Sequence, residues 1–401
     1  MPNRLAIRPR SAKYKAFRLL AAMERPFRKR PPLDAQYLRS IRNFLLLQYD
    51  TPLGSAVHAT PLFAAIRKVL PDAYICVAAS PMAASVYAHN PHINSCTVTA
   101  DPMRDFFGAL RDVHRIYEQL PPGEVCIATT LGNQRSRLAF LAAMTGRAVR
   151  VGYIVAKPMF DFPLAYHFGV SQIDANLEIL RTLGHTATAL EPQVFFTSQD
   201  REHAGRLLRA ADPSEERTRI AFVTQNSGGQ PNQWREQRFQ QVIDTLAAHY
   251  DAEPIFVGGA KESARIERLR AGLRQQGSNL AGKTTVPQLA AVLSQCDLAV
   301  SLDTGTFHVA RAVGLPGAVI APGWQNPIEW LPLGHSKYRV LWNGPTRKDP
   351  AQPYLDEISV EQVLAAANDL LTHFPPSQTA RAARTATGLN LHAAERLEAH
   401  G

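Results

Sequence analysis

The chain has 401 residues and a formal net charge of +10, and 45% of its residues are hydrophobic against 19% that are charged. The charge is uneven, because residues 1–30 contain ten basic side chains and one acidic one, which leaves the rest of the chain close to neutral. A near-neutral body disfavours a nucleic-acid-binding protein, since phosphate binding needs basic groups on the folded surface.

Residues 1–40 form a basic N-terminal arm. From Arg4 to Phe27 basic residues alternate with apolar ones, which is typical of an amphipathic segment on an anionic membrane surface. A solvated tail is the other interpretation, because prolines interrupt the apolar face. The composition also resembles an organellar transit peptide, whereas the absence of a continuous apolar core argues against a secretory signal.

Short apolar runs bounded by polar residues predict buried strands from residue 43 onward. Helical patterns of about ten to fifteen residues separate most of them, and this alternation predicts parallel sheets covered on both faces. No run reaches the ~18 apolar residues of a membrane-spanning helix. We expect strands at 43–48, 74–79, 125–129, 149–153, 220–224, 254–258, 298–302 and 318–321.

The alternation is interrupted by a connector at residues 191–219, which contains two prolines and a helical run. The sequence therefore predicts an α/β protein with two doubly wound Rossmann-like domains facing each other across a cleft. We place the first domain at 41–195, the second at 196–356, a closing helix at 357–374 and a loosely held tail at 375–401.

The loop after the strand at 298–302 carries the strongest chemical signal. It reads Asp303-Thr304-Gly305-Thr306, with His308 two residues further on. Gly305 permits a tight turn, and a helix starting near Thr306 would direct its backbone N–H groups at an anion such as a diphosphate. Asp303 could accept hydrogen bonds from sugar hydroxyls. Capping of the helix by Asp303 or Thr304 is the alternative.

The segment Asp303–Pro316, followed by Ala321-Pro322-Gly323, resembles the donor-site signature of the family nine glycosyltransferases, the heptosyltransferases. The similarity extends to Leu53–Pro61 and Val257–Glu262, and covers about residues 43–373. It implies the two-domain GT-B fold, with an ADP-heptose-like donor on the second domain and the acceptor on the first. It also implies metal-independent chemistry with no further cofactor.

The resemblance assigns roles by position. Glu262 would contact the ribose or adenine, although by itself it is only an acid at a helix start. Residues of the loop already described would hold the diphosphate and sugar, with His308 beside them. The loop after the strand at 220–224 would support the donor phosphates, with Ser227 and Asn232 as candidate contacts.

Two positions depart from the family pattern. The catalytic aspartate is replaced by Ser55, next to Gly54 in the expected acceptor-side loop, and losing such a base typically costs roughly 10²–10⁴ in rate. The phosphate-supporting lysine is replaced by Asn232, which has no charge, and Arg235 is a candidate to compensate.

Asp50 and His58 are candidate replacement bases. An imidazole titrates near neutral pH and suits this role. The structural alternatives are a turn acid for Asp50 and a locally hydrogen-bonded helix residue for His58.

The leading hypothesis is an inverting glycosyltransferase that transfers a sugar, heptose by resemblance, from a nucleotide donor to a glycan or glycolipid acceptor. We expect it to be cytoplasmic and peripheral on the inner membrane, attached through residues 1–30. One alternative is a catalytically impaired nucleotide-sugar-binding member acting as a partner or regulatory subunit. Another is an epimerase or hydrolase acting on a nucleotide sugar.

Overall fold

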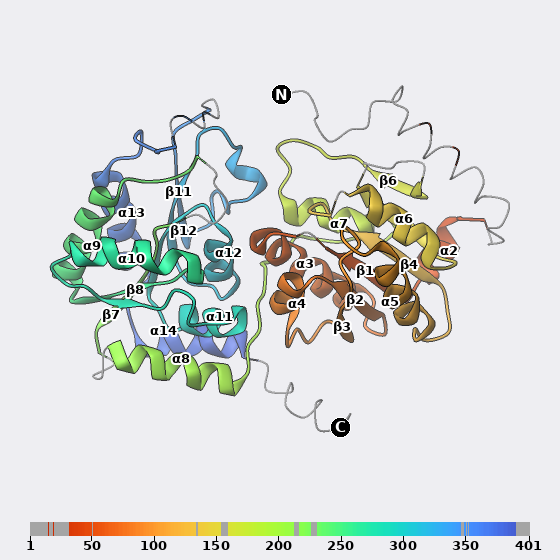
Figure 1. Ribbon diagram of the computed structural model, residues 1–401, viewed down its shortest axis with the longest axis horizontal. Coiled ribbons are helices and arrows are strands. Elements are labelled where there is room, and N and C mark those ends of the chain that lie inside the picture. The colour runs from red at the N-terminus through yellow and green to blue at the C-terminus, as the bar shows by residue number, and fades with distance from the viewer. Residues whose placement is uncertain are drawn as a thin grey trace. The chain divides into compact units, whose positions relative to one another are not determined.

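A computed structural model gives the structure of residues 32–49, 51–133, 135–153, 159–211, 216–225, 231–345, 349, 351 and 353–389, together with Lys15 and Leu19. The chain divides into two compact units, Met1–Leu190 and Glu191–Gly401. Each unit contains one six-stranded parallel sheet with helices packed on it (Figure 1). The predicted two-domain, doubly wound α/β class is therefore confirmed.

The sheet of the first unit has the strand order β3-β2-β1-β4-β5-β6. Helices α5 and α6 share a core cluster with one face of it, while α3 packs against both α4 and α7. The strands are β1 Asn43–Gln48, β2 Tyr74–Ala79, β3 Ser95–Val98, β4 Val125–Thr129, β5 Val149–Tyr153 and β6 Phe162–Leu164. The helices are α2 Ala35–Ser40, α3 Leu53–Val69, α4 Pro81–Tyr87, α5 Phe106–Glu118, α6 Ser136–Thr145 and α7 Gln172–Thr182.

The sheet of the second unit has the order β12-β11-β10-β7-β8-β9. Helices α9, α10 and α13 contribute to its main core cluster, and α11 packs against α8, α12 and α14. The strands are β7 Thr218–Val223, β8 Ala252–Phe256, β9 Ser278–Asn279, β10 Leu298–Leu302, β11 Gly317–Ala321 and β12 Tyr338–Trp342. The helices are α8 Ser198–Ala211, α9 Glu236–Tyr250, η3 Ala260–Glu262, α10 Ser263–Ala271, α11 Val286–Ser294, α12 Gly305–Ala312, η4 Pro327–Glu329, α13 Val360–His373 and α14 Gln378–Gly388.

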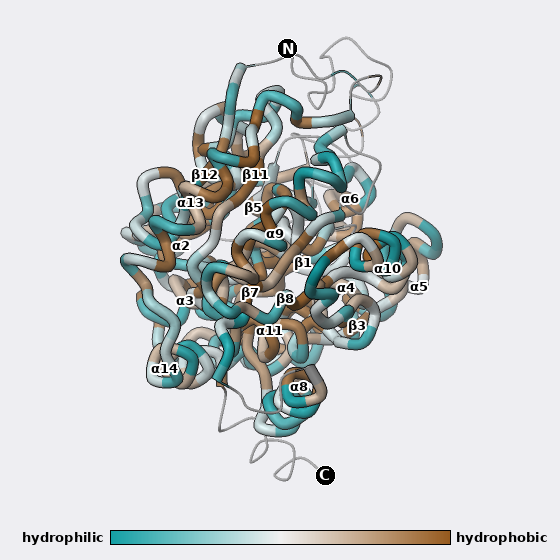
Figure 2. The backbone as a smooth tube through the Cα atoms, turned by 90° about the vertical axis from the view of Figure 1, so that its left-hand side faces the viewer, coloured by the Kyte–Doolittle hydropathy of each residue, from teal (hydrophilic) through white to brown (hydrophobic). Residues whose placement is uncertain are grey.

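The central strands form where the sequence has continuous apolar runs. Every residue of β1, β4 and β10 is buried, as expected for parallel strands covered on both faces. Figure 2 shows hydrophobic residues concentrated in the central strands and hydrophilic ones on outer helices such as α8. Burial on both faces therefore explains why the sequences of these strands are apolar throughout and do not alternate between apolar and polar residues.

All eight predicted strands are present, although β7 and β8 each begin two residues earlier than expected. The sequence analysis missed four strands, and these four are the two edges of each sheet: β3, β6, β9 and β12. Edge strands are paired on one side only and are partly exposed here, so they lack a continuous apolar run.

The prediction of a loosely held tail is wrong for residues 378–389. This segment contains α14, whose Arg381 is 8% exposed and binds Asp297 through Nε at 2.9 Å. The Asp297 carboxylate also accepts the backbone N–H of Arg219, at the start of β7, at 2.9 Å. A buried charge pair thus attaches the helix to the sheet, which an Ala- and Thr-rich composition did not indicate.

Candidate functional site

Two loops of the second unit meet where the strand order of its sheet reverses. β7 and β10 are neighbours, and the chain continues from β7 to β8 on one side and from β10 to β11 on the other. Ligands of doubly wound proteins bind at this position, outside the carboxyl ends of the strands. The side-chain amide of Asn232, from the loop after β7, donates to the backbone carbonyl oxygen of Asp303 at 3.1 Å. The structure thus joins the two loops that the sequence assigned to the donor.

Asp303 and His308 form the buried polar centre of this region, with side chains 10% and 4% exposed. Burial raises the pKa of Asp303 to about 7. Burial, with a smaller contribution from the charge of Arg311, lowers the pKa of His308 to about 3. The Nε2 atom of His308 lies 3.8 Å from Oδ1 of Asp303, too far for a hydrogen bond. At neutral pH the imidazole is therefore neutral, and the carboxyl group beside it keeps its proton to a higher pH than an ordinary Asp.

Arg311 is a buried residue of this region that the sequence analysis did not single out. It lies one turn after His308 in α12 and donates two hydrogen bonds to the carboxylate of Glu191, at 2.8 and 3.0 Å. Burial opposes ionisation of Glu191, but the bonds from Arg311 outweigh it and lower the pKa of Glu191. The pair attaches the first residue of the second unit to the helix that follows β10.

The start of α12 is suited to binding an anion. Thr304 precedes the helix, and no side chain caps it. The Oγ1 atom of Thr304 is buried and makes no hydrogen bond within the described part of the chain. Capping therefore does not explain Asp303 or Thr304. The first N–H groups of a helix have no intrahelical partner, so those of Gly305 and Thr306 can bind an anion, while the N–H of Phe307 already donates to the carbonyl oxygen of Thr304.

Glu262 lies at the end of η3, in the loop region after β8. Its Oε2 atom accepts the backbone N–H of Gly259 at 2.7 Å, which completes a local cap. A Cβ atom at Gly258 would lie 2.3 Å from this oxygen, so the glycine leaves room for the carboxylate to fold back. The structure thus shows the local role of Glu262 and leaves its contact with a ribose as a prediction.

Asn232 carries no charge, and the charge of Arg235 is already paired within the protein. Asn232 is 2% exposed. Arg235 pairs with Asp356 through both Nε and Nη2, with the Nε–Oδ1 distance 2.6 Å, and lies over the ring of Tyr354. The expectation that Arg235 compensates for the missing lysine is therefore not supported by its contacts. Ser227 lies outside the described residues.

On the first unit, Gly54 and Ser55 belong to a helix. The sequence analysis placed them in a loop, but α3 begins at Leu53, directly after Pro52. A proline at a helix start is favourable, because it lacks only an N–H that would have no partner there. The loop after β1 is therefore shorter than expected.

Two candidate bases of the first unit, Ser55 and His58, are buried. Ser55 is 8% exposed and His58 is 1% exposed. A Cβ atom at Gly132 would lie 3.1 Å from Cβ of Ser55, so the loop after β4 packs closely on the start of α3. Asp50 lies outside the described residues.

The sequence analysis also missed a buried polar cluster at the carboxyl ends of β1 and β4, where the strand order of the first sheet reverses. Its members are at most 5% exposed and are joined by side-chain hydrogen bonds. They are Gln48, Thr51, Thr130 and Asn133. The polar residues at the carboxyl ends of two otherwise apolar strands could have indicated this cluster.

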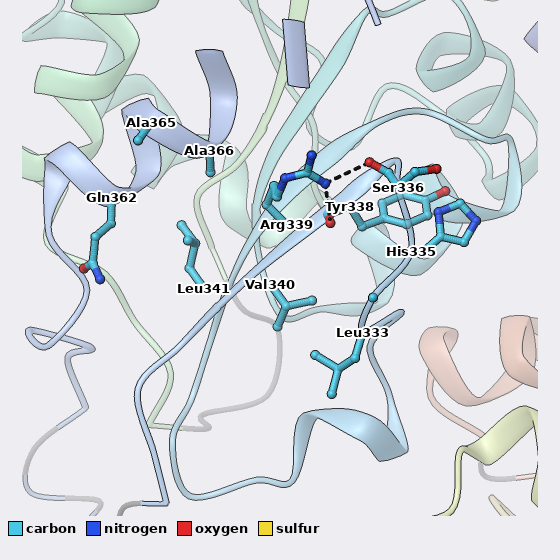
Figure 3. Close-up of a pocket in the computed structure, with 11 residues that line it drawn as sticks. Leu333, His335, Ser336, Tyr338, Arg339, Val340, Leu341, Gln362, Ala365 and Ala366 are labelled. Atoms are coloured by element: carbon cyan, nitrogen blue, oxygen red, sulfur yellow. Dashed lines mark hydrogen bonds between the residues drawn. The ribbon is translucent and has the colours of Figure 1, made fainter. Parts of the chain in front are cut away.

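A groove of about 550 Å³ lies elsewhere on the second unit, between β12 and α13 (Figure 3). Leu333, Leu341 and Ala366 contribute apolar lining, and Arg339 donates to the carbonyl oxygens of Ser336 and Tyr338. None of the residues predicted to bind substrate lines this groove. It is therefore separate from the loops that the sequence assigned to the donor.

The described residues contain neither a metal-binding cluster nor a membrane-spanning helix. Within the described ranges, no group of three or more His, Cys, Asp or Glu side chains is arranged to hold a metal ion. The helices of the same ranges include none with the length and hydropathy needed to cross a membrane. The four cysteines are free thiols.

Residues 133–356 match the family model described as glycosyltransferase family 9 (heptosyltransferase). Lipopolysaccharide heptosyltransferase 3 of Escherichia coli K12 is 23% identical over 344 residues, which cover 81% of this chain and 97% of the relative. A family 9 glycosyltransferase structure from Veillonella parvula superposes with a TM-score of 0.73 at 19% identity, covering 84% of this chain and 99% of that one. The E. coli ADP-heptose lipopolysaccharide heptosyltransferase II structure gives 0.66 at 19% identity, covering 82% and 98%.

Proposed function

The chain belongs to glycosyltransferase family 9, the heptosyltransferase family, and we propose that it transfers heptose from ADP-heptose to a lipopolysaccharide-type acceptor with inversion. The observation that carries the donor assignment is the uncapped start of α12 beside buried Asp303, at the switch point of the second sheet. The names of relatives that act on lipopolysaccharide support the acceptor class.

On the donor side, the N–H groups at the start of α12 hold the diphosphate, and Thr304 Oγ1 donates to it or to the sugar. Asp303 accepts hydrogen bonds from sugar hydroxyls, with His308 supporting it as a neutral neighbour. Glu262 keeps its bond to Gly259 through one oxygen and offers the other to the ribose. The hydrogen bond from Asn232 to the carbonyl oxygen of Asp303 holds the loop that begins at Asp303 in place.

On the acceptor side, a hydroxyl oxygen forms a bond to the anomeric carbon while the bond from that carbon to the diphosphate breaks. The hydroxyl proton must pass to a base. Ser55 is an unassisted hydroxyl, and His58 is almost fully buried. We therefore place Asp50 first among the candidate bases, and the proton moves to its carboxylate.

A second candidate function is nucleotide-sugar binding without transfer. Two observations favour it. Position 55 has a serine and no carboxylate, and the side chain of Asn232 donates to the backbone of Asp303, so it offers no charge to a donor phosphate. Calorimetry with ADP-heptose, combined with product analysis, separates the two: binding without transfer to any core acceptor supports this alternative. Turnover of the donor without an acceptor would instead indicate a hydrolase or epimerase.

The proposed location is the cytoplasmic face of the inner membrane. It rests on the ten basic residues of the first 30, nearly all of which lie outside the described residues. Each basic group near an anionic surface contributes about 1 kcal/mol, and salt weakens the attraction. Deletion of residues 1–30 should release the protein from anionic vesicles without abolishing ADP-heptose binding. Vesicle binding that survives the deletion would make the arm a solvated tail.

A further inference from the structure

One buried side chain holds the segment between β1 and α3. Asn133 is 2% exposed. Its Oδ1 atom accepts the backbone N–H of Tyr49 at 2.5 Å and the hydroxyl of Thr51 at 3.1 Å. Its Nδ2 atom donates to Oε1 of Gln48 at 3.2 Å and to Oγ1 of Thr130 at 3.0 Å. A side-chain amide has two donor hydrogens and two acceptor lone pairs, so all four are used.

This pattern requires an asparagine. Aspartate would keep the bonds from Tyr49 and Thr51 but would offer no donor to Gln48 and Thr130, and a buried unpaired carboxylate is costly. Alanine would leave the Tyr49 N–H and its neighbours without partners in a site that water does not reach. The side chain therefore determines how the two loops meet.

The position of this amide connects it to the acceptor side. Asn133 ends the loop that follows β4, and the same loop packs on Ser55 through Gly132. The Thr51 hydroxyl lies within hydrogen-bond distance of two acceptors, Oδ1 of Asn133 and the carbonyl oxygen of Tyr49 at 2.9 Å, which share its single hydrogen. Tyr49 and Thr51, on the way from β1 into α3, are thus held from the neighbouring loop at the switch point of the first sheet.

We propose that Asn133 is a positioning residue, which holds Tyr49 and Thr51, and with them the entry into α3, in the arrangement that sugar transfer needs on the acceptor side. Asn133 itself touches neither substrate. The proposal rests on the proposed transferase function for its catalytic consequence, but its structural part can be tested independently.

A general loss of stability is the competing explanation, and Asn43 provides a matched control. It is also an asparagine that is 2% exposed, but it lies at the opposite end of β1, where its Nδ2 atom donates to the carbonyl oxygen of Pro121 at 3.0 Å. Asn43→Ala removes one side-chain hydrogen bond from a buried asparagine of the same unit and leaves the contacts of Asn133 with Tyr49 and Thr51 in place.

The first experiment is hydrogen–deuterium exchange, read by mass spectrometry, on the full chain. In Asn133→Ala the backbone amides of residues 49–55 should exchange about tenfold faster or more, while those of β1 keep their protection. Asn43→Ala should leave the same segment unchanged. Unchanged exchange at 49–55 in Asn133→Ala overturns the proposal, whatever the activity of the protein.

The second experiment measures steady-state transfer from ADP-heptose to heptose-deficient lipopolysaccharide. Thr51→Val should lower kcat about tenfold with an unchanged KM for ADP-heptose, and Thr51→Ser, which keeps the hydroxyl, should restore it. An equal loss in Asn43→Ala would reduce Asn133 to a structural role. A wild-type protein that transfers nothing refutes the proposed function, and the exchange result then still decides on Asn133.

Discussion

The side-chain amide of Asn232 donates a hydrogen bond to the backbone carbonyl oxygen of Asp303, at 3.1 Å, across the switch point of the second sheet. The resemblance to family 9 assigns a phosphate-supporting lysine to this position. In this chain the residue joins two loops instead of presenting a charge. Any stabilisation of the donor diphosphate must then come mainly from the backbone at the start of α12.

Asn232→Asp should weaken ADP-heptose binding about tenfold, because a carboxylate would replace the donor and face the Asp303 carbonyl oxygen. Calorimetry measures the affinity. Asn343→Asp is the control, since its Nδ2 atom makes the same kind of bond to the carbonyl oxygen of Glu357 on an exposed loop. Equal affinities in wild type and Asn232→Asp would show that the link does not support the donor site.

Asp303 should make the folded protein less stable as pH rises. Its pKa is raised by burial from 3.8 to about 7, so between these values the unfolded chain releases a proton that the folded chain keeps. The free energy of unfolding therefore falls by roughly 4 kcal/mol between pH 4 and pH 7 for a pKa shift of this size. It levels off above pH 7.

Asp303→Asn isolates this effect, because the amide resembles the neutral acid at every pH. The variant should gain stability relative to wild type between pH 4 and pH 8, as measured by urea unfolding. Titration of His308, whose pKa is lowered to about 3, acts on both proteins below pH 6.5 and cancels in the comparison. A stability difference that is the same at pH 4 and pH 8 contradicts the buried neutral carboxyl.

Arg381→Met should lower the free energy of unfolding by about 3 kcal/mol, because it leaves the buried Asp297 carboxylate without its main partner. Arg339→Met is the matched control. Its partner is Asp369, and both side chains are about one-third exposed, so the loss should stay near or below about 1 kcal/mol. Similar losses in the two variants would mean that α14 is not attached through Asp297.

Asp50→Asn should lower kcat by roughly 10²–10⁴ with an unchanged affinity for ADP-heptose, if Asp50 takes the acceptor proton. Asp72→Asn, in an exposed turn of the same unit, is the control. Full activity of Asp50→Asn would show that Asp50 is not the base and would leave His58 as the candidate.

The interior of both sheets was predictable, because strands covered on both faces must be apolar along their whole length. β1 and β10 illustrate this. The edge strands β3 and β12 were not, since exposure on one side allows polar residues such as Ser95 and Arg339. The attachment of α14 depends on a charge pair between residues 84 apart in the chain, which no local pattern indicates.

The position of the loop from Asp303 to His308, after β10 and at the switch point, could be predicted because its residues are contiguous in sequence. The cluster around Asn133 could not, because it brings together side chains from the ends of two strands that are about 80 residues apart. The local cap formed by Glu262 and the pairing of Arg235 with Asp356 also became visible only in three dimensions.

We expect the second unit to hold a nucleotide-sugar donor at Asp303 and the start of α12 for transfer to an acceptor. The most direct test is mass-spectrometric detection of heptose transfer from ADP-heptose to a panel of lipopolysaccharide core acceptors, with wild type and Asp303→Ala side by side. We expect transfer by the wild type and a loss of about 100-fold or more in the variant. Transfer that is unchanged in Asp303→Ala would show that Asp303 does not hold the donor.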